Sequence, residues 1–185
     1  MSFKILIVCI GNVCRSAQAE RLLRLRLDEL LGDKSGAFDV ASTGVRALVG
    51  NPMDKSSARE LERLGGRAEG FVSTQLTSSH VQHADLVLTA TKILRSRVLQ
   101  DVPAALRRTF TLPEFAALVL DATADSPQNL VADAAKCRAS AHVENYDVSD
   151  PIGRSPEVHR HVADVLDWCT QVIATSLAKT TLSDG

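Results

Sequence analysis

Short apolar runs alternate along this chain with segments in which apolar residues recur every three or four positions. Residues 4–9 are apolar at every position after the first, which predicts a strand buried on both faces. Residues 85–90 contain a similar run, and two shorter stretches, 39–42 and 108–112, predict further strands. The spacing of three and four predicts helices over residues 17–31, 56–64, 92–100, 113–120, 130–139 and 156–178.

Strands that alternate with helices are typical of a parallel sheet covered by helices on both faces. We therefore predict an α/β fold with three layers, α/β/α. Ligands of such sheets bind beyond the carboxyl ends of the strands, and Cys9 ends the first predicted strand. A functional site is expected at this edge of the sheet.

The length of the chain, 185 residues with 45% hydrophobic content, suits one domain that buries a core without disulfides. We predict a single domain over residues 1–178 and a frayed tail at 179–185. Residues 119–146 are irregular and indicate an insertion. This insertion could be a lid, a partner surface or a plain surface insertion.

Charge and aromatic content exclude several classes of function. A formal net charge of −1 and 4% aromatic residues argue against a nucleic-acid-binding groove.

No stretch of the sequence approaches the roughly 18 apolar residues of a membrane span. The apolar run at residues 5–10 is also shorter than the core of a signal peptide. We expect a cytoplasmic protein, monomeric or weakly dimeric, with no nucleic-acid or membrane partner.

The histidines and cysteines of the chain are the residue types that most often bind metal ions. His159 and His161 are two positions apart, so on a helix they point to different sides, and we interpret both as solvated. No metal site is predicted. In a reducing compartment the cysteines are expected to be free, catalytic or redox-active rather than structural bridges; they are Cys9, Cys14, Cys137 and Cys169.

The most informative stretch is residues 9–16, Cys-Ile-Gly-Asn-Val-Cys-Arg-Ser, between a predicted strand and the start of a helix. A loop in this position can aim several backbone N–H groups inward, and the helix dipole adds positive charge, which together form an anion site. Gly11 and Asn12 tolerate left-handed backbone, which lets the loop curl around a group the size of phosphate.

Two side chains of this stretch carry the chemistry. Arg15 has a planar fork that matches two phosphate oxygens, and the positive field favours the thiolate form of Cys9, a nucleophile. Ser16 could cap the helix and also donate a hydrogen bond to the Cys9 sulfur. The plain structural interpretation is a buried strand-end cysteine, a Gly-Asn turn and a solvated arginine. A Walker-type nucleotide loop fits less well, because no Gly-Lys-Ser or Gly-Lys-Thr follows.

Residues 8–16 resemble the Cys-x-Gly-Asn-x-Cys-Arg-Ser loop of the low molecular weight protein tyrosine phosphatases. The resemblance covers residues 3–118 and 147–178, including Ala19-Glu20, Ser42-Thr43-Gly44, Gly50-Asn51-Pro52-Met53-Asp54, the 75–77 and 85–89 segments, and Asp150-Pro151-Ile152-Gly153. It implies a four-stranded parallel sheet of order 2-1-3-4 and no cofactor or metal. It also implies hydrolysis of a phosphorylated protein or small phosphomonoester through a phosphocysteine intermediate.

The resemblance also implies roles for individual residues. Cys9 would be the nucleophile, Arg15 the phosphate clamp, and Asp150 the general acid and then the base. Asn12 would shape the loop with Ser42 as its hydrogen-bond partner, and Ser16 would support the thiolate. Phosphate would be bound by the whole loop: Ile10, Gly11, Asn12, Val13, Cys14, Arg15 and Ser16.

The assignment of Asp150 has a physical basis of its own. A leaving oxygen needs a proton, and Pro151 fixes the backbone beside this carboxylate. A turn or cap role for Asp150, and Asp147 as the acid, remain open. Cys14 is implied by the resemblance to form a reversible disulfide with Cys9, but could equally be a buried packing thiol.

The sequence departs from the family pattern at the walls of the cleft. Leu48 and Ile152 are aliphatic where the family usually has aromatics, which costs a phosphotyrosine ring about 0.5–1.5 kcal/mol per lost aromatic pair. Val13 favours phosphotyrosine as the substrate, because related phosphoarginine enzymes carry Thr at this position.

Two functions other than a phosphatase are considered as alternatives. One is an arsenate reductase that uses an external thiol, and the other is a non-catalytic module that binds phosphorylated ligands. Cys137 and Cys169 are interpreted as structural or incidental.

Overall fold

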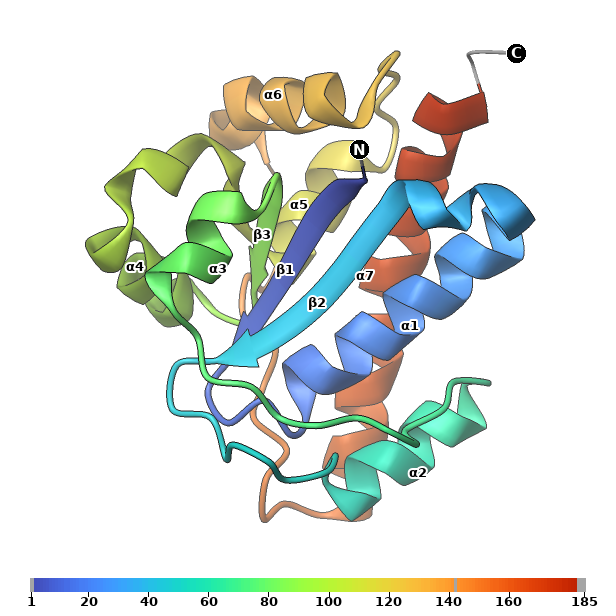
Figure 1. Ribbon diagram of the computed structural model, residues 1–185, viewed down its shortest axis with the longest axis vertical. Helices are drawn as coiled ribbons and strands as arrows, with labels where there is room; N and C mark the ends of the chain where they lie inside the picture. The colour runs from blue at the N-terminus through green and yellow to red at the C-terminus, as the bar shows by residue number, and fades with distance from the viewer. Residues whose placement is uncertain (1, 142, 183–185) are drawn as a thin grey trace.

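The computed structural model describes residues 2–141 and 143–182 (Figure 1). Within these ranges one sheet contains four strands, all parallel, in the order β2-β1-β3-β4. Ile5 of β1 lies opposite Val40 of β2 and Leu86 of β3. The strands are β1 (Phe3–Cys9), β2 (Phe38–Gly44), β3 (Leu86–Thr89) and β4 (Thr109–Thr111). The predicted α/β class and the strand order implied by the resemblance are both confirmed.

Helices cover both faces of this sheet (Figure 1). The described α-helices are α1 (Arg15–Leu31), α2 (Lys55–Arg63), α3 (Ser78–His83), α4 (Lys92–Asp101), α5 (Leu112–Val119), α6 (Pro127–Cys137) and α7 (Pro156–Leu182). Short 3-10 helices add η1 (Gly32–Ala37), η2 (Pro103–Arg108) and η3 (Arg138–Ser140). The sequence did not predict α3, because six residues are too few for a helical period; the side chains of Thr77 and His80 form a capping box that starts it.

The central strand explains why the core has two halves. Phe3, Ile5 and Ile7 of β1 belong to one buried cluster, which also contains apolar residues of α1, α5, α6 and α7. Leu6 and Val8 face the opposite way, into a cluster with residues of α3 and α4. Successive side chains of a strand point to opposite faces, so a strand covered on both sides must be apolar throughout. Burial on both faces therefore explains the apolar run at residues 4–9.

The segment at 119–146, which the sequence predicts as an insertion, contains α6, which packs against α5, α7 and η2. Leu130, Val131 and Ala134 of α6 are buried in the main cluster. Beyond α6, Arg138 forms an ion pair with the buried carboxylate of Glu114 and lies over the ring of Phe110. These contacts hold this part of the segment against the sheet as a structural cover.

Two predictions in the last third of the chain need correction. Helix α7 continues through residues 179–182, where the sequence predicted fraying, and Thr180 is buried; residues 183–185 lie outside the described residues. His159 is buried and not solvated, because the first turn of α7 packs against the start of α2. Its Nδ1 lies 4.0 Å from Asp54 Oδ1. His161 is exposed as predicted.

Among the described residues, no helix is both long and apolar enough to cross a membrane.

Candidate active site

The loop at residues 9–16 leaves the carboxyl end of β1 and enters α1, as predicted. Asn12 is in the left-handed region, with φ of +54°, whereas Gly11 is not. The neighbouring strand approaches the loop so closely that a Cβ on Gly44 would lie 2.5 Å from the carbonyl oxygen of Ile10. Glycine at this position therefore allows the end of β2 to support the loop backbone.

The Cys9 sulfur lies inside this loop and accepts two hydrogen bonds. One comes from the backbone N–H of Asn12 at 3.2 Å, and the other from the hydroxyl of Ser16 at 2.9 Å. Both donors stabilise negative charge on the sulfur. The prediction that Ser16 caps the helix is wrong: Cys14 is at the N-cap position, without a side-chain cap, and Ser16 lies in the first turn with its hydroxyl turned to Cys9.

The side chain of Asn12 connects the loop to β2. Its Nδ2 donates to the hydroxyl oxygens of Ser16 and Ser42, each at 2.9 Å, and its Oδ1 accepts the N–H of Thr74 at 2.7 Å. The bond to Ser42 is the one that the resemblance implied. Because all three polar contacts of this buried side chain are made, the left-handed backbone at Asn12 is held in place.

Glu20 also belongs to this network, a role that was not predicted although Ala19-Glu20 is part of the resemblance. Its Oε2 accepts the hydroxyl of Ser42 at 2.6 Å, and its Oε1 pairs with Arg24 Nη2 at 3.3 Å. The signal available in the sequence was its position one turn after Ser16 on α1, which brings the two side chains to the same side of the helix. A buried carboxylate there orients the Ser42 hydroxyl, which leaves the oxygen of Ser42 to accept from Asn12.

Arg15 links the loop to a segment more than a hundred residues away. Its guanidinium donates to the carbonyl oxygen of Val148 at 3.0 Å and to Asp150 Oδ2 at 2.7 Å. The Arg15 side chain is 4% exposed and that of Asp150 is 44% exposed. The pair thus places a solvent-accessible carboxylate beside the loop that contains Cys9.

The structure separates the two candidate acids. Asp147 Oδ1 accepts the backbone N–H of Lys92 at 2.7 Å, so this carboxylate caps the start of α4. Asp150 makes a turn contact, from the N–H of Ile152 to Oδ1 at 3.2 Å, and keeps its second oxygen on Arg15. The turn role considered for Asp150 therefore coexists with a position at the site.

Cys14, within the loop at the N-cap position of α1, has a buried thiol. Burial raises its pKa to about 12, and the nearby charge of Asp54 acts in the same direction, while a hydrogen bond with Ser57 opposes them. Cys14 is therefore protonated at neutral pH and is a poor nucleophile as it stands. A disulfide with Cys9, which the resemblance implied, stays a prediction, and both thiols are free and buried in this structure.

The two aliphatic residues predicted to form the walls of the cleft are both exposed. Leu48 is 51% exposed, and its N–H donates to the carbonyl oxygen of Gly11 at 3.0 Å, which places it over the loop. Ile152 is also 51% exposed and follows the Asp-Pro pair. Ile10 is exposed, whereas Val13 is buried.

Comparison with known proteins agrees with this arrangement. The sequence model of the family described as low molecular weight phosphotyrosine protein phosphatase matches residues 4–138. This chain belongs to that family. Family membership confirms the prediction of a phosphatase, an enzyme of the hydrolase class, and the match includes part of the segment that was predicted to be an insertion.

Individual relatives of this phosphatase differ in their named substrates. The low molecular weight protein-tyrosine-phosphatase Ptp of Acinetobacter johnsonii is 32% identical over 113 residues, which cover 60% of this chain and 74% of Ptp. Among solved structures, the tyrosine phosphatase AmsI of Erwinia amylovora has a TM-score of 0.73 at 25% identity, covering 96% of this chain and 94% of AmsI. The YwlE arginine phosphatase of Geobacillus stearothermophilus has a TM-score of 0.74 at 28% identity, covering 99% and 97%.

Proposed function

We propose that this phosphatase hydrolyses phosphomonoesters of the phosphotyrosine type through a phosphocysteine intermediate, with Cys9, Arg15 and Asp150 as the catalytic residues. One observation carries the proposal. A thiol that accepts two hydrogen bonds lies in the same loop as a buried guanidinium, and that guanidinium holds a solvent-accessible carboxylate at 2.7 Å. The proposed acid thus lies beside the loop that contains the proposed nucleophile and clamp, although it is 135 residues away from Arg15 in the sequence.

In the first step the Cys9 thiolate attacks phosphorus, and the bond between phosphorus and the leaving oxygen breaks. Asp150 in its protonated form donates a proton to that oxygen. The phosphoryl oxygens are bound by Arg15 and by backbone N–H groups of the loop, which are oriented before the reaction and therefore stabilise the charge that develops. The phosphate group also competes for the fork of Arg15, which releases the Asp150 carboxyl for proton transfer.

In the second step water attacks the phosphocysteine, and the bond between sulfur and phosphorus breaks. Asp150, now a carboxylate, takes a proton from this water. The Ser16 hydroxyl and the Asn12 N–H stabilise the thiolate as it leaves, because both already donate to the sulfur. The side chains of Asn12 and Ser42 act on this step only by positioning the loop and the Ser16 hydroxyl.

The direct test is hydrolysis of p-nitrophenyl phosphate and of a phosphotyrosine peptide by the full chain between about pH 5 and 7. We expect turnover that vanadate inhibits competitively, since vanadate would occupy the same loop. Absence of turnover on both substrates, with phosphate still bound, would instead support the non-catalytic alternative.

Phosphoarginine is the second candidate substrate, because YwlE, which is named an arginine phosphatase, is 28% identical to this chain over nearly its full length. The loop argues for phosphotyrosine, since Val13 is buried and brings no hydroxyl to the site. A panel of phosphotyrosine, phosphoserine and phosphoarginine peptides distinguishes these candidates. The relatives described above are named phosphatases, which does not favour the arsenate-reductase alternative.

Replacing Asp150 by asparagine is expected to lower kcat on a phosphotyrosine peptide by about 10²- to 10³-fold, because general acid catalysis is lost. The loss should be smaller on p-nitrophenyl phosphate, whose leaving group needs less help from a proton. Asp147→Asn is the matched control and should retain kcat, because Asp147 caps α4. If instead Asp147→Asn abolishes turnover and Asp150→Asn does not, the acid has been assigned to the wrong carboxylate.

Leu48→Trp is expected to raise kcat/KM for the phosphotyrosine peptide by about 2- to 12-fold, the equivalent of one aromatic pair worth 0.5–1.5 kcal/mol. Turnover of the phosphoserine peptide should not change, because it has no ring to stack. The control is Ile93→Trp, which adds an indole at a residue that is 79% exposed on α4. An unchanged ratio between the two peptides would mean that Leu48 is not a wall of the substrate cleft.

A further inference from the structure

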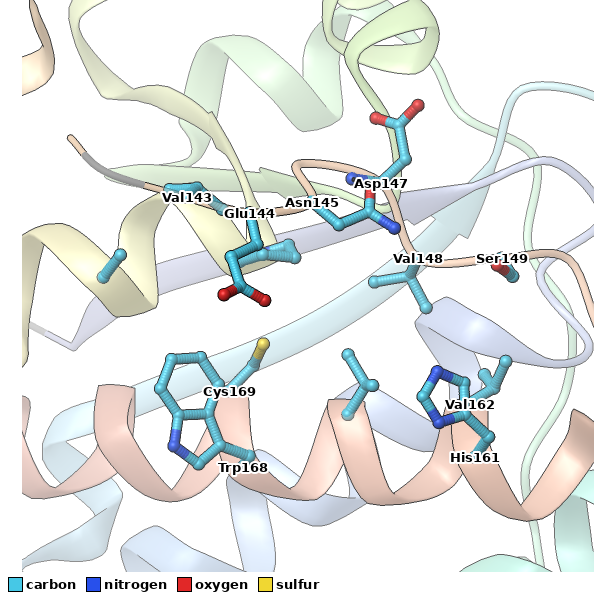
Figure 2. Close-up of a pocket in the computed structure, with 13 residues that line it drawn as sticks. Val143, Glu144, Asn145, Asp147, Val148, Ser149, His161, Val162, Trp168 and Cys169 are labelled. Atoms are coloured by element: carbon cyan, nitrogen blue, oxygen red, sulfur yellow. Dashed lines mark hydrogen bonds between the residues drawn. The ribbon is translucent and has the colours of Figure 1, made fainter.

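A pocket lies between the segment of residues 143–149, which we call the strap, and helix α7 (Figure 2). Its volume is about 430 Å³, within the range of sites that hold small molecules. Val148 separates it from the loop at residues 9–16: the carbonyl oxygen accepts from Arg15, while the residue also lines the pocket. The pocket is thus distinct from the proposed catalytic site, although both share the strap.

One side of the pocket is apolar and includes an exposed indole. Val162, Val165 and Trp168 of α7 line it, together with Pro113 and Ala117 of α5. Trp168 is 48% exposed and is the only tryptophan in the sequence. An indole that is half exposed beside a cavity offers a flat face to an apolar or cationic group.

The charged groups of the lining are predominantly acidic. Glu144 extends from the strap toward α7, into the pocket that Trp168 also lines (Figure 2). Asp147 lines the same pocket, and one of its oxygens accepts the N–H of Lys92. The described lining contains neither lysine nor arginine, and its one basic residue is His161. No donor or cation among the described residues pairs with Glu144.

The remaining reactive group of the lining is Cys169, which adds no charge. It is fully buried on the apolar face of α7, as the sequence predicted, and burial raises its pKa to about 12. The thiol is therefore neutral at physiological pH. The acidic side chain that extends into the pocket is Glu144, whereas the Asp147 carboxylate points away from α7 and lies at the start of α4 (Figure 2). An anionic ligand would therefore be repelled by Glu144 and a cationic one attracted.

We propose that this pocket binds an organic cation, an amine or guanidinium attached to an apolar body. The cation would pair with the carboxylate of Glu144 and lie over the face of Trp168, while the apolar body would fill the space against Val162 and Val165. Binding at this site does not depend on the proposed phosphatase chemistry and is measured separately from it.

The experiment is a titration of the full chain with 2-phenylethylguanidine, followed by the fluorescence of Trp168, the single indole. We expect a saturable change, and at least about 10-fold weaker binding of 2-phenylethylurea, which has the same shape without the charge. Glu144→Gln should weaken binding of the guanidine by about 5-fold or more. The matched control Glu69→Gln removes one exposed carboxylate outside the pocket and should leave binding unchanged.

Three outcomes would overturn the proposal. The first is the absence of a saturable fluorescence change together with the absence of heat in calorimetry. The second is equal binding of the urea and the guanidine, which would indicate an apolar cavity that does not select charge. The third is equal binding by Glu144→Gln and Glu69→Gln, with both variants folded by circular dichroism. Calorimetry with Trp168→Phe checks the indole without relying on its fluorescence and should show weaker binding.

Discussion

Cys9→Ser is expected to reduce kcat on p-nitrophenyl phosphate by at least about 10⁴-fold, because a serine hydroxyl in this loop cannot supply the thiolate that attacks phosphorus. The hydrogen bonds from Asn12 and Ser16 that stabilise a negative sulfur are too weak to ionise an alcohol at neutral pH. The measurement is steady-state hydrolysis with wild type and variant at equal concentration.

The control for this variant is Cys137→Ser, at the exposed end of α6, which should keep full activity. Phosphate binding by Cys9→Ser, measured by calorimetry, shows whether the loop still forms, since the anion is bound by Arg15 and the backbone N–H groups. Turnover within 10-fold of wild type in Cys9→Ser would remove Cys9 as the nucleophile. Loss of both turnover and phosphate binding would show that the substitution disturbs the loop itself.

Arg15→Lys is expected to lower kcat/KM by about 10²- to 10³-fold although the positive charge is kept. The guanidinium donates to Val148 and Asp150 through different nitrogens, and its fork matches two phosphate oxygens. An ammonium group is a single point of charge and cannot hold the strap and the phosphate in the same geometry. The measurement is kcat/KM together with the inhibition constant of inorganic phosphate, which should also become weaker.

Arg107→Lys is the matched control, because Arg107 is exposed in η2, away from the loop. It should leave both constants unchanged. If Arg15→Lys retains kcat/KM within a few-fold of wild type, positive charge alone is sufficient and the fork is not the clamp. A melting temperature recorded for each variant separates this result from a loss of folded protein, since Arg15 is almost fully buried.

The parts of the fold that follow from local pattern were predicted well. Short apolar runs and stretches placed all four strands. The recurrence of apolar residues every three or four positions placed six helices within a few residues of their limits: α1, α2, α4, α5, α6 and α7. The elements that it missed are short. For α3, a capping box between Thr77 and His80 starts a helix that has no apolar period.

The order of residues in the loop was also sufficient to locate the candidate site. Cys9 and Arg15 belong to one continuous segment between a buried strand and a helix, so their proximity follows from the chain itself. The same holds for Asn12, whose left-handed backbone is a local property that asparagine tolerates. Family membership was evident from this segment for the same reason.

Other features depended on contacts between distant segments. The sequence favoured Asp150 as the acid but left Asp147 open, and it gave no contacts for either carboxylate. The packed structure gives them: Asp147 accepts a backbone N–H at the start of α4, whereas Asp150 pairs with Arg15. His159 looks like a solvated helix residue until α7 packs against α2. A hydrophobic period reports which face of an element is buried, but not which partner buries it.

By itself, then, the sequence determined the fold class, the family and the loop that contains Cys9 and Arg15, because each of these is encoded in a continuous stretch of residues. Tertiary structure alone decided which carboxylate meets Arg15, how Glu20 and Ser42 support Asn12, and that Trp168 and Glu144 face one pocket. These contacts join residues far apart in the chain, and their geometry arises only when helices and strap pack on the sheet.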